Sequence, residues 1–211
     1  MSCLRVIVKF SVDGDIRFIS HRDMMRMFSR ALARADLPIR FSEGFNPRPR
    51  LSLVLPRPVG VASDDEMLLL DFAEAVATER IEAGLADQLP DGIALLQVEP
   101  VDSSYRPRVR SVRYTLPLEP DQGQSVGRKV AEMLNAELVS VTRQKPGAQQ
   151  QRQRNIRRYI EQAGIDRHGQ LYLELLVADD GTARPAELLE WLGLPAKPYL
   201  AQLRRTCVQY A

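Results

Sequence analysis

The sequence has 211 residues, of which 45% are hydrophobic and 27% charged, and its formal net charge is +2. This is the composition of a soluble globular protein with one large or two small domains, and no apolar run approaches the roughly 20 residues of a membrane-spanning helix. Two cysteines and two histidines argue against a disulfide framework or a zinc site, and the first residues show no signal-peptide pattern. We therefore expect a cytoplasmic protein with no metal, no cofactor and no membrane contact.

Charge is divided into blocks along the chain. Residues 1–60 hold 11 Lys and Arg against 5 Asp and Glu, whereas residues 61–102 hold 11 acidic residues against one basic residue, Arg80. Residues 103–160 are basic again, with 12 Lys and Arg against 4 acids. Such blocks predict a molecule with one basic and one acidic side rather than a uniformly cationic binder.

The first half, 1–102, predicts six elements in the order β-α-β-β-α-β. Alternating apolar residues predict strands at 5–12, 51–55, 67–72 and 93–98, and helical spacing predicts helices at 22–36 and 79–89. Thr78 is the expected cap of the second helix, and Asp64-Asp65 is the expected acidic turn before the third strand. This order is the split βαβ, or ferredoxin-like, pattern.

The first helix and the loop that follows it carry most of the basic charge of this half. Ser20 and Asp23 are placed to form a capping box, and one apolar face is expected to be buried. On another side, arginines recur every four residues. The loop 42–50 contains two prolines, which makes it stiff and places its arginines beside the helix. The expected buried face is Met24, Phe28, Ala31 and Ala35, and the arginine row is Arg22, Arg26, Arg30 and Arg34.

The second half, 103–211, is expected to repeat the order of the first. Residues 99–108 are the expected linker; strands are predicted at 109–118, 138–142, 171–177 and 204–210, and helices at 124–134 and 185–192. The expected fold is therefore α+β, with two tandem ferredoxin-like (βαββαβ) halves. A polar, basic insertion at 143–154 has no apolar periodicity, and residues 145–154 of it are expected to be mobile.

Basic residues with occasional aromatics on such a frame favour anion binding, above all RNA binding through phosphate contacts and stacking. Arginine is also the side chain suited to forked contacts with phosphate or carboxylate. The alternative is a solvated helix face with long side chains lying over apolar surface. The candidate nucleic-acid or anion-binding residues are Arg22, Arg26, Arg30, Phe45, Asn46, Arg48, Arg50, Arg154 and Arg157.

No set of residues indicates catalysis. The nucleotide-binding patterns GxGxxG and GxxxxGK[ST] are absent. The run Ser20-His21-Arg22-Asp23 contains suggestive residue types, but adjacent helix residues do not face one another. Capping accounts for Ser20 and Asp23, which leaves His21 either in contact with an anion or simply exposed.

Residues 14–61 carry a family resemblance, in the run GDIRFISHRDMMRMFSRALARADLPIRFSEGFNPRPRLSLVLPRPVGV. This run resembles a bacterial domain of unknown function described as radical-SAM-linked, which occurs alone or fused to a larger radical S-adenosylmethionine protein. Weaker echoes of the family are Arg154-Asn155-Ile156-Arg157 and Thr182-Ala183-Arg184-Pro185, which adds Arg184 to the candidate functional residues. Arg48 stands where the family loop more often has His.

The resemblance implies an accessory role, because this chain lacks the CxxxCxxC that would hold an iron–sulfur cluster. The leading hypothesis is a non-catalytic protein that binds RNA and serves a separately encoded radical-SAM enzyme. The second is a docking module for that enzyme without RNA binding. The third is an enzyme in its own right, which would use His21 and an acidic residue brought near by folding.

Overall fold

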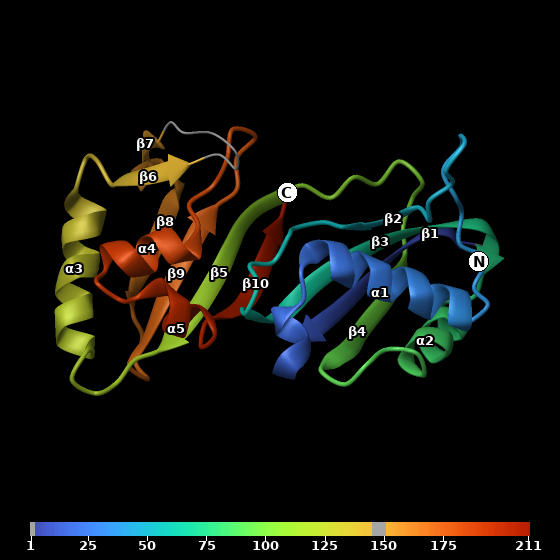
Figure 1. Ribbon diagram of the computed structural model, residues 1–211, viewed down its shortest axis with the longest axis horizontal. Coiled ribbons are helices and arrows are strands. Elements are labelled where there is room, and N and C mark those ends of the chain that lie inside the picture. The colour runs from blue at the N-terminus through green and yellow to red at the C-terminus, as the bar shows by residue number, and fades with distance from the viewer. Residues whose placement is uncertain (1–2, 145–150) are drawn as a thin grey trace. The chain divides into compact units, whose positions relative to one another are not determined.

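The computed structural model describes residues 3–144 and 151–211. The chain divides into two units, Met1–Arg108 and Val109–Ala211, and each is described by itself (Figure 1). Among the described residues, no helix is both long and apolar enough to cross a bilayer.

The first unit is an antiparallel sheet with two helices on one face (Figure 1). The strand order is β4-β1-β3-β2. The chain between β1 and α1 forms a short 3-10 helix, η1. The elements are β1 (Cys3–Val12), η1 (Gly14–Phe18), α1 (His21–Arg34), β2 (Leu51–Leu53), β3 (Ala62–Val76), α2 (Thr78–Ala86) and β4 (Ile93–Pro100).

The core of this unit lies between the sheet and the helices. Alternate residues of β1 point toward α1, whose buried positions are Met24, Phe28, Ala31 and Leu32. Phe28 meets Phe10 of β1 edge-on, with ring centroids 4.9 Å apart. The helical face expected from the sequence is confirmed, except that Ala35 is only half-buried.

Two expectations about the first unit are wrong. Asp64 and Asp65 lie inside β3, which starts at Ala62, because the long strand β1 continues to pair with it: Val12 is opposite Ser63, and Lys9 Nζ lies 3.7 Å from Asp65 Oδ1. Thr78 is not a cap, since α2 has Ala77 at the N-cap position and no side chain caps it.

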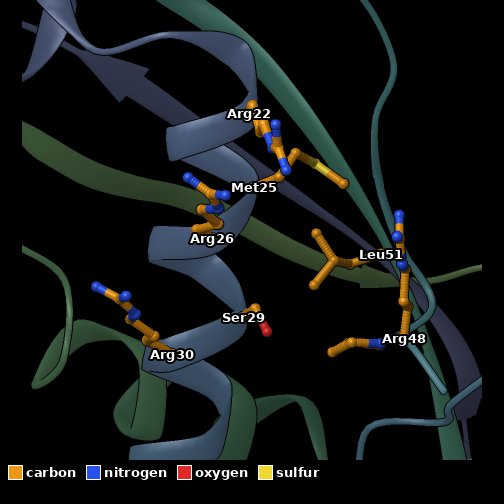
Figure 2. A pocket seen from close by; sticks show the side chains of 8 residues that line it. Arg22, Met25, Arg26, Ser29, Arg30, Arg48 and Leu51 are labelled. Atoms are coloured by element: carbon orange, nitrogen blue, oxygen red, sulfur yellow. The ribbon is translucent and has the colours of Figure 1, made fainter. Parts of the chain in front are cut away.

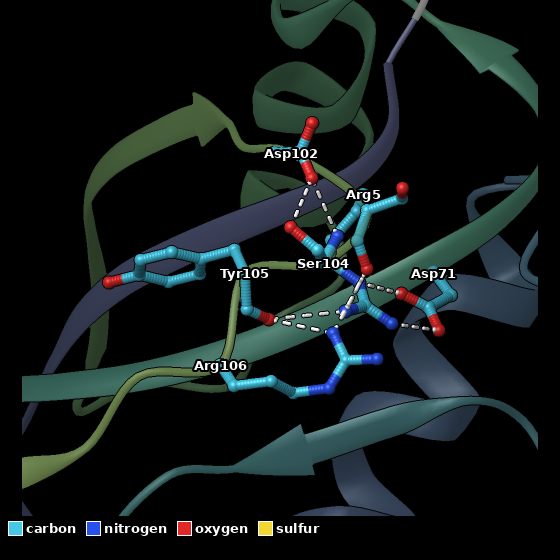
Figure 3. Close-up of polar contacts among 7 residues, drawn as sticks. Arg5, Asp71, Asp102, Ser104, Tyr105 and Arg106 are labelled. Atoms are coloured by element: carbon cyan, nitrogen blue, oxygen red, sulfur yellow. Dashed lines mark hydrogen bonds and ion pairs between the residues drawn. The ribbon is translucent and has the colours of Figure 1, made fainter.

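The segment after β4 is held against β1 and β3 by Arg5 (Figure 3). Its Nε and Nη2 donate to the two carboxylate oxygens of Asp71, at 2.5 and 2.8 Å. Nη1 donates to the carbonyl oxygens of Ser103 and Tyr105, at 2.6 and 3.1 Å. One partly buried guanidinium therefore joins two strands to the chain that leaves the unit.

The second unit also has an antiparallel sheet, of order β10-β5-β9-β8, and a separate pair of strands, β6 and β7. When β6 and β7 are left out, the strands of each unit lie in the same order across the sheet. Counted along the chain, this order is fourth, first, third, second. The elements are β5 (Val109–Pro117), α3 (Gly123–Asn135), β6 (Ser140–Gln144), β7 (Gln151–Asn155), η2 (Arg157–Tyr159), β8 (Ile160–Ile165), β9 (Gln170–Leu176), α4 (Pro185–Trp191), α5 (Ala196–Leu200) and β10 (Arg204–Tyr210). The expected α+β class is confirmed.

The insertion at 143–154, for which the sequence predicts no strand, contains one in the part that the structure describes, while its mobility stays a prediction. Residues 151–154 belong to β7, which pairs with β6, for example Val141 with Arg154. Backbone hydrogen bonds hold such a ribbon without apolar side chains, so its sequence shows no periodicity. Arg143 anchors β6 to α4 through both carboxylate oxygens of Glu187, at 2.6 and 2.7 Å. Residues 145–150 lie outside the described residues.

Candidate functional site

Helix α1 presents its arginines because its start and its buried face are both well defined. Ser20 Oγ accepts a hydrogen bond from the backbone N–H of Asp23 at 3.2 Å, which caps the first turn. With Met24 and Phe28 in the core, the four-residue repeat of Arg22, Arg26 and Arg30 falls on exposed positions.

The loop 40–50 is a narrow ribbon rather than an irregular excursion. The N–H of Ser42 donates to the carbonyl of Arg48 at 2.8 Å, and the N–H of Arg48 donates to Ser42 Oγ at 3.0 Å. Below them, the N–H of Arg50 donates to the carbonyl of Arg40 at 2.7 Å. Gly44 has φ +119 near the tip, a conformation that favours glycine. This ribbon fixes the position of Arg48.

Arg48 and α1 face each other across a cavity of about 370 Å³ (Figure 2). Its charged lining comes from the two elements that the sequence singled out: Arg22, Arg26 and Arg30 from α1, and Arg48 from the ribbon. The other lining residues are Met25 and Ser29 of α1, Pro49 of the ribbon and Leu51 of β2. The cavity has the size of a small-ligand pocket, with guanidinium groups around a mainly apolar floor.

The electrostatics of the cavity are unbalanced. Arg26 is paired with Asp23, 3.1 Å from Nη1 to Oδ1, but both side chains are about half exposed. In the described part of the chain, the guanidinium groups of Arg22, Arg30 and Arg48 contact no hydrogen-bond acceptor. Three cationic groups without acceptors, next to a fourth that is only weakly paired, favour an anionic ligand.

A second hollow, of about 500 Å³, lies on the other side of the arginine row. Arg26 and Arg30 line it too, together with Arg34, whose Nε and Nη2 donate to the side chain and the backbone carbonyl of Gln88, both at 2.7 Å. Asp23 and Asp87 also line it, so its charge is mixed. The anionic ligand is therefore expected in the first cavity.

Asp23, next to the arginine row, has a lowered pKa. The hydroxyl of Ser20 donates to its Oδ2 at 2.7 Å, and this bond, followed by the contact with Arg26, holds the pKa of Asp23 below its usual range. The carboxylate thus stays charged beside Arg26.

The remaining candidates of the first unit lie outside the cavity. Phe45 is fully exposed at the tip of the ribbon, and Asn46 beside it is exposed. Arg50 is exposed, and its backbone joins the ribbon to β3, since the N–H of Asp71 donates to its carbonyl at 3.0 Å. His21 is exposed at the first position of α1.

The candidates of the second unit have local structural roles or are exposed. Arg157 donates to the carbonyl of Leu134 through Nε and Nη2, at 3.2 and 2.8 Å, and to the carbonyl of Ile160 at 3.0 Å. These bonds fasten the end of α3 to β8. Arg154 is exposed on β7, and exposed Arg184 precedes α4, where its N–H donates to Glu187 Oε2 at 2.9 Å.

The apolar floor is the part of the site that sequence reasoning missed. Met25, Ser29 and Leu51 are half-buried, and none carries a charge that would single it out. The sequence feature that could have indicated them is their place on the helix. Met25 and Ser29 are four residues apart and lie between the arginine row and the buried face.

Nothing in the described residues forms a metal site, since no three His, Cys, Asp or Glu side chains gather there in a group that could hold an ion. The fold and the cavity thus define a class: an α+β protein whose first unit has a cavity lined by arginines.

The chain belongs to a bacterial family, described as uncharacterized proteins conserved in bacteria (DUF2344), whose model matches residues 5–185. A search of curated proteins finds no match to the chain. Among solved structures, the small subunit of acetolactate synthase from Thermotoga maritima is similar at 11% identity, over 98% of this chain and 95% of that one. The TM-score is 0.23, which is too low to support a conclusion about fold or function.

Proposed function

We propose that this protein is a non-catalytic accessory protein that binds RNA at the arginine-lined cavity and serves a separately encoded radical-SAM enzyme. The observation that carries the RNA proposal is that Arg22, Arg30 and Arg48, which contact no acceptor in the described part of the chain, all line one cavity. The link to a radical-SAM enzyme is supported by the resemblance of residues 14–61 alone.

Phosphate is the anion that suits this arrangement. A guanidinium group presents two parallel N–H donors to two phosphate oxygens, and it keeps its charge at any physiological pH. Cations held side by side on a helix and a ribbon repel one another, so a ligand with several negative charges stabilises them better than a single ion. A nucleic-acid backbone supplies such charges at regular intervals.

Two acidic residues of the first unit are paired within the unit and are less available for docking a partner. Asp71 is occupied by Arg5, and Asp65 lies 3.7 Å from Lys9. Part of the acidic charge counted in the sequence is therefore used within the unit. Other acidic residues of this segment, among them Glu74, Glu79 and Glu82, are exposed, so the preference for RNA rests on the arginine-lined cavity.

The two units also support a proposal about the fold: that the chain consists of two tandem ferredoxin-like halves, the second with the ribbon β6–β7 inserted. The equivalent strand order of the two sheets, fourth-first-third-second, supports it. Each half would then contain the β-α-β-β-α-β order.

Filter binding of total cellular RNA across a salt series tests the RNA proposal. The variant is Arg22→Gln with Arg48→Gln, and the matched control is Arg80→Gln with Arg128→Gln, which removes the same charge from exposed positions elsewhere. Each phosphate contact contributes about 0.7–0.9 to the slope of log K against log salt, so the cavity variant should lose up to about 1.4–1.8 of that slope.

The control pair should keep both its affinity and its slope. Affinity of the unaltered protein no better than that of a charge-matched unrelated protein would reject RNA binding and favour the docking module. The radical-SAM proposal has its own test, which is whether a radical-SAM reading frame adjoins this gene.

A further inference from the structure

Phe45 is the most exposed large apolar side chain in the described part of the molecule. It stands at the tip of the ribbon, between Ser42 and Arg48, whose mutual hydrogen bonds of 2.8 and 3.0 Å close the turn. The neighbouring aromatic Phe41 is half exposed at the base of the same ribbon. A fully exposed ring contributes nothing to the core, and here it is displayed on a closed turn instead of a free loop.

The position of Phe45 relates it to the phosphate site. Phe45 and Arg48 are three positions apart in the sequence, so the two side chains arise within about 10 Å of each other along the chain. An aromatic face next to a row of cations is the arrangement with which proteins hold single-stranded nucleic acids, where bases stack and the backbone follows the charge.

We infer that the arginine-lined cavity selects unpaired RNA: one nucleoside lies on the apolar floor of the cavity, and an adjacent base stacks on Phe45. This inference rests on the proposed function and specifies its ligand. It assigns a base-contacting role to the floor and to the ribbon tip, whereas the arginines contact only phosphate.

The shape and chemistry of the cavity support an unpaired nucleotide. A surface that bound only phosphate would need no apolar area, yet this cavity of about 370 Å³ is lined by Met25, Pro49 and Leu51 as well as by arginines. Guanidinium groups at the rim and apolar atoms below match a nucleotide, which has a charged backbone and a flat, weakly polar base.

Duplex RNA can place neither a nucleoside in the cavity nor a base on Phe45. Its bases are stacked on one another and paired, and its major groove is too deep and narrow for side chains to read. An aromatic side chain on a short ribbon reaches a base only where the strand is single or locally unpaired. The site should tolerate many sequences, because every base has a π-face.

The test compares one labelled 12-nucleotide RNA as a single strand and annealed to its complement. The proteins are the unaltered chain, Phe45→Ala, Phe45→Leu and Phe45→Tyr. Loss of one stacked base should weaken single-strand binding about 5- to 150-fold in the Ala variant. The Leu variant should also lose affinity, since it keeps the apolar volume without the ring, and the Tyr variant should retain it.

Two further readouts separate this inference from the proposed function. The salt slope should be unchanged in all three Phe45 variants, because no charge is removed. Ser29→Phe, which places a ring at a half-buried lining position, should weaken single-strand binding by a larger factor than duplex binding.

Equal affinity for single strand and duplex would overturn the inference while leaving RNA binding by the arginines intact. The inference would also be overturned if Phe45→Ala or Phe45→Leu bound the single strand as well as the unaltered chain does. The same holds if Ser29→Phe bound it equally well. Failure to bind either RNA above a charge-matched control protein would instead reject the proposed function, and this inference with it.

Discussion

Replacing Phe28 with Ala should destabilise the first unit strongly, whereas the same replacement at Phe45 should not. Phe28 is fully buried, and its ring meets that of Phe10 edge-on at 4.9 Å between centroids. Emptying a core aromatic site costs about 3–5 kcal/mol, and the aromatic pair accounts for about 0.5–1.5 kcal/mol of it. Phe45 is fully exposed, so its replacement should change the free energy of unfolding by less than about 0.5 kcal/mol.

Urea denaturation followed by circular dichroism measures both variants. With a slope of about 1–3 kcal/mol per molar urea, a loss of about 4 kcal/mol lowers the midpoint by about 1–4 M. That is a large part of the total stability of a typical domain, so the Phe28 variant should be studied at low temperature. Equal midpoints for the two variants would contradict the burial of the Met24–Phe28 face and the placement of α1 on the sheet.

Two other arginines should matter for stability and not for RNA. Arg157→Ala removes three hydrogen bonds to carbonyls at the end of α3 and at β8. We expect the free energy of unfolding, measured by urea denaturation, to fall by about 1–3 kcal/mol. RNA affinity in filter binding should be unchanged. Arg5→Lys cannot reproduce the forked contact with Asp71 together with the two carbonyl contacts, so it should cost about 1.5–3 kcal/mol, and full retention of stability would show that a point charge suffices.

The sequence was sufficient to predict an element where its local pattern agrees with the tertiary structure. The helix with its Ser20 cap, its buried face and its row of arginines follows from spacing alone, and the structure has it from His21 to Arg34. Prediction from the sequence failed where pairing with a distant strand determines the secondary structure. Asp64 and Asp65 have the composition of a turn, but pairing with β1 extends β3 through them.

Strand β7 and the short helix α5 were missed for a related reason. All five residues of β7 are exposed, so no apolar pattern indicates the strand, which exists because β6 pairs with it. Helix α5 has only five residues, no buried residue and a proline within it. Apolar periodicity detects burial, and these elements have little of it.

The candidate site likewise has one part that the sequence predicts and one part that depends on tertiary contacts. Helical spacing placed Arg22, Arg26 and Arg30 on one side of α1, but only the hydrogen bonds of the ribbon bring Arg48 opposite them. Arg50, two residues further along the same chain segment, does not line the cavity. Arg48 lies in the hydrogen-bonded turn with Ser42, whereas Arg50 lies at the base of the ribbon, bonded through its backbone to Arg40 and Asp71. The sequence of the loop gave no basis for telling these two arginines apart.

Asp23 provides a test in which stability and binding change independently. The hydrogen bond from the Ser20 hydroxyl, and then the contact with Arg26, lower its pKa. A lowered pKa means that the carboxylate stabilises the fold above its unfolded value of about 3.9, and that this contribution is lost as the pH falls through the folded value. Asp23→Asn should therefore weaken the dependence of stability on pH below about 4.

The same substitution should strengthen RNA binding at pH 7, because it removes a negative charge from the arginine row and releases Arg26. A gain of about 2- to 5-fold corresponds to an exposed ion pair. Asp166→Asn is the matched control: its pKa is also lowered, chiefly by the N–H of Gln170, but it lies in the second unit. Both variants should lose acid-dependent stability, and only Asp23→Asn should gain affinity. A gain in both would mean that net charge, and not the arginine-lined cavity, governs the binding of RNA.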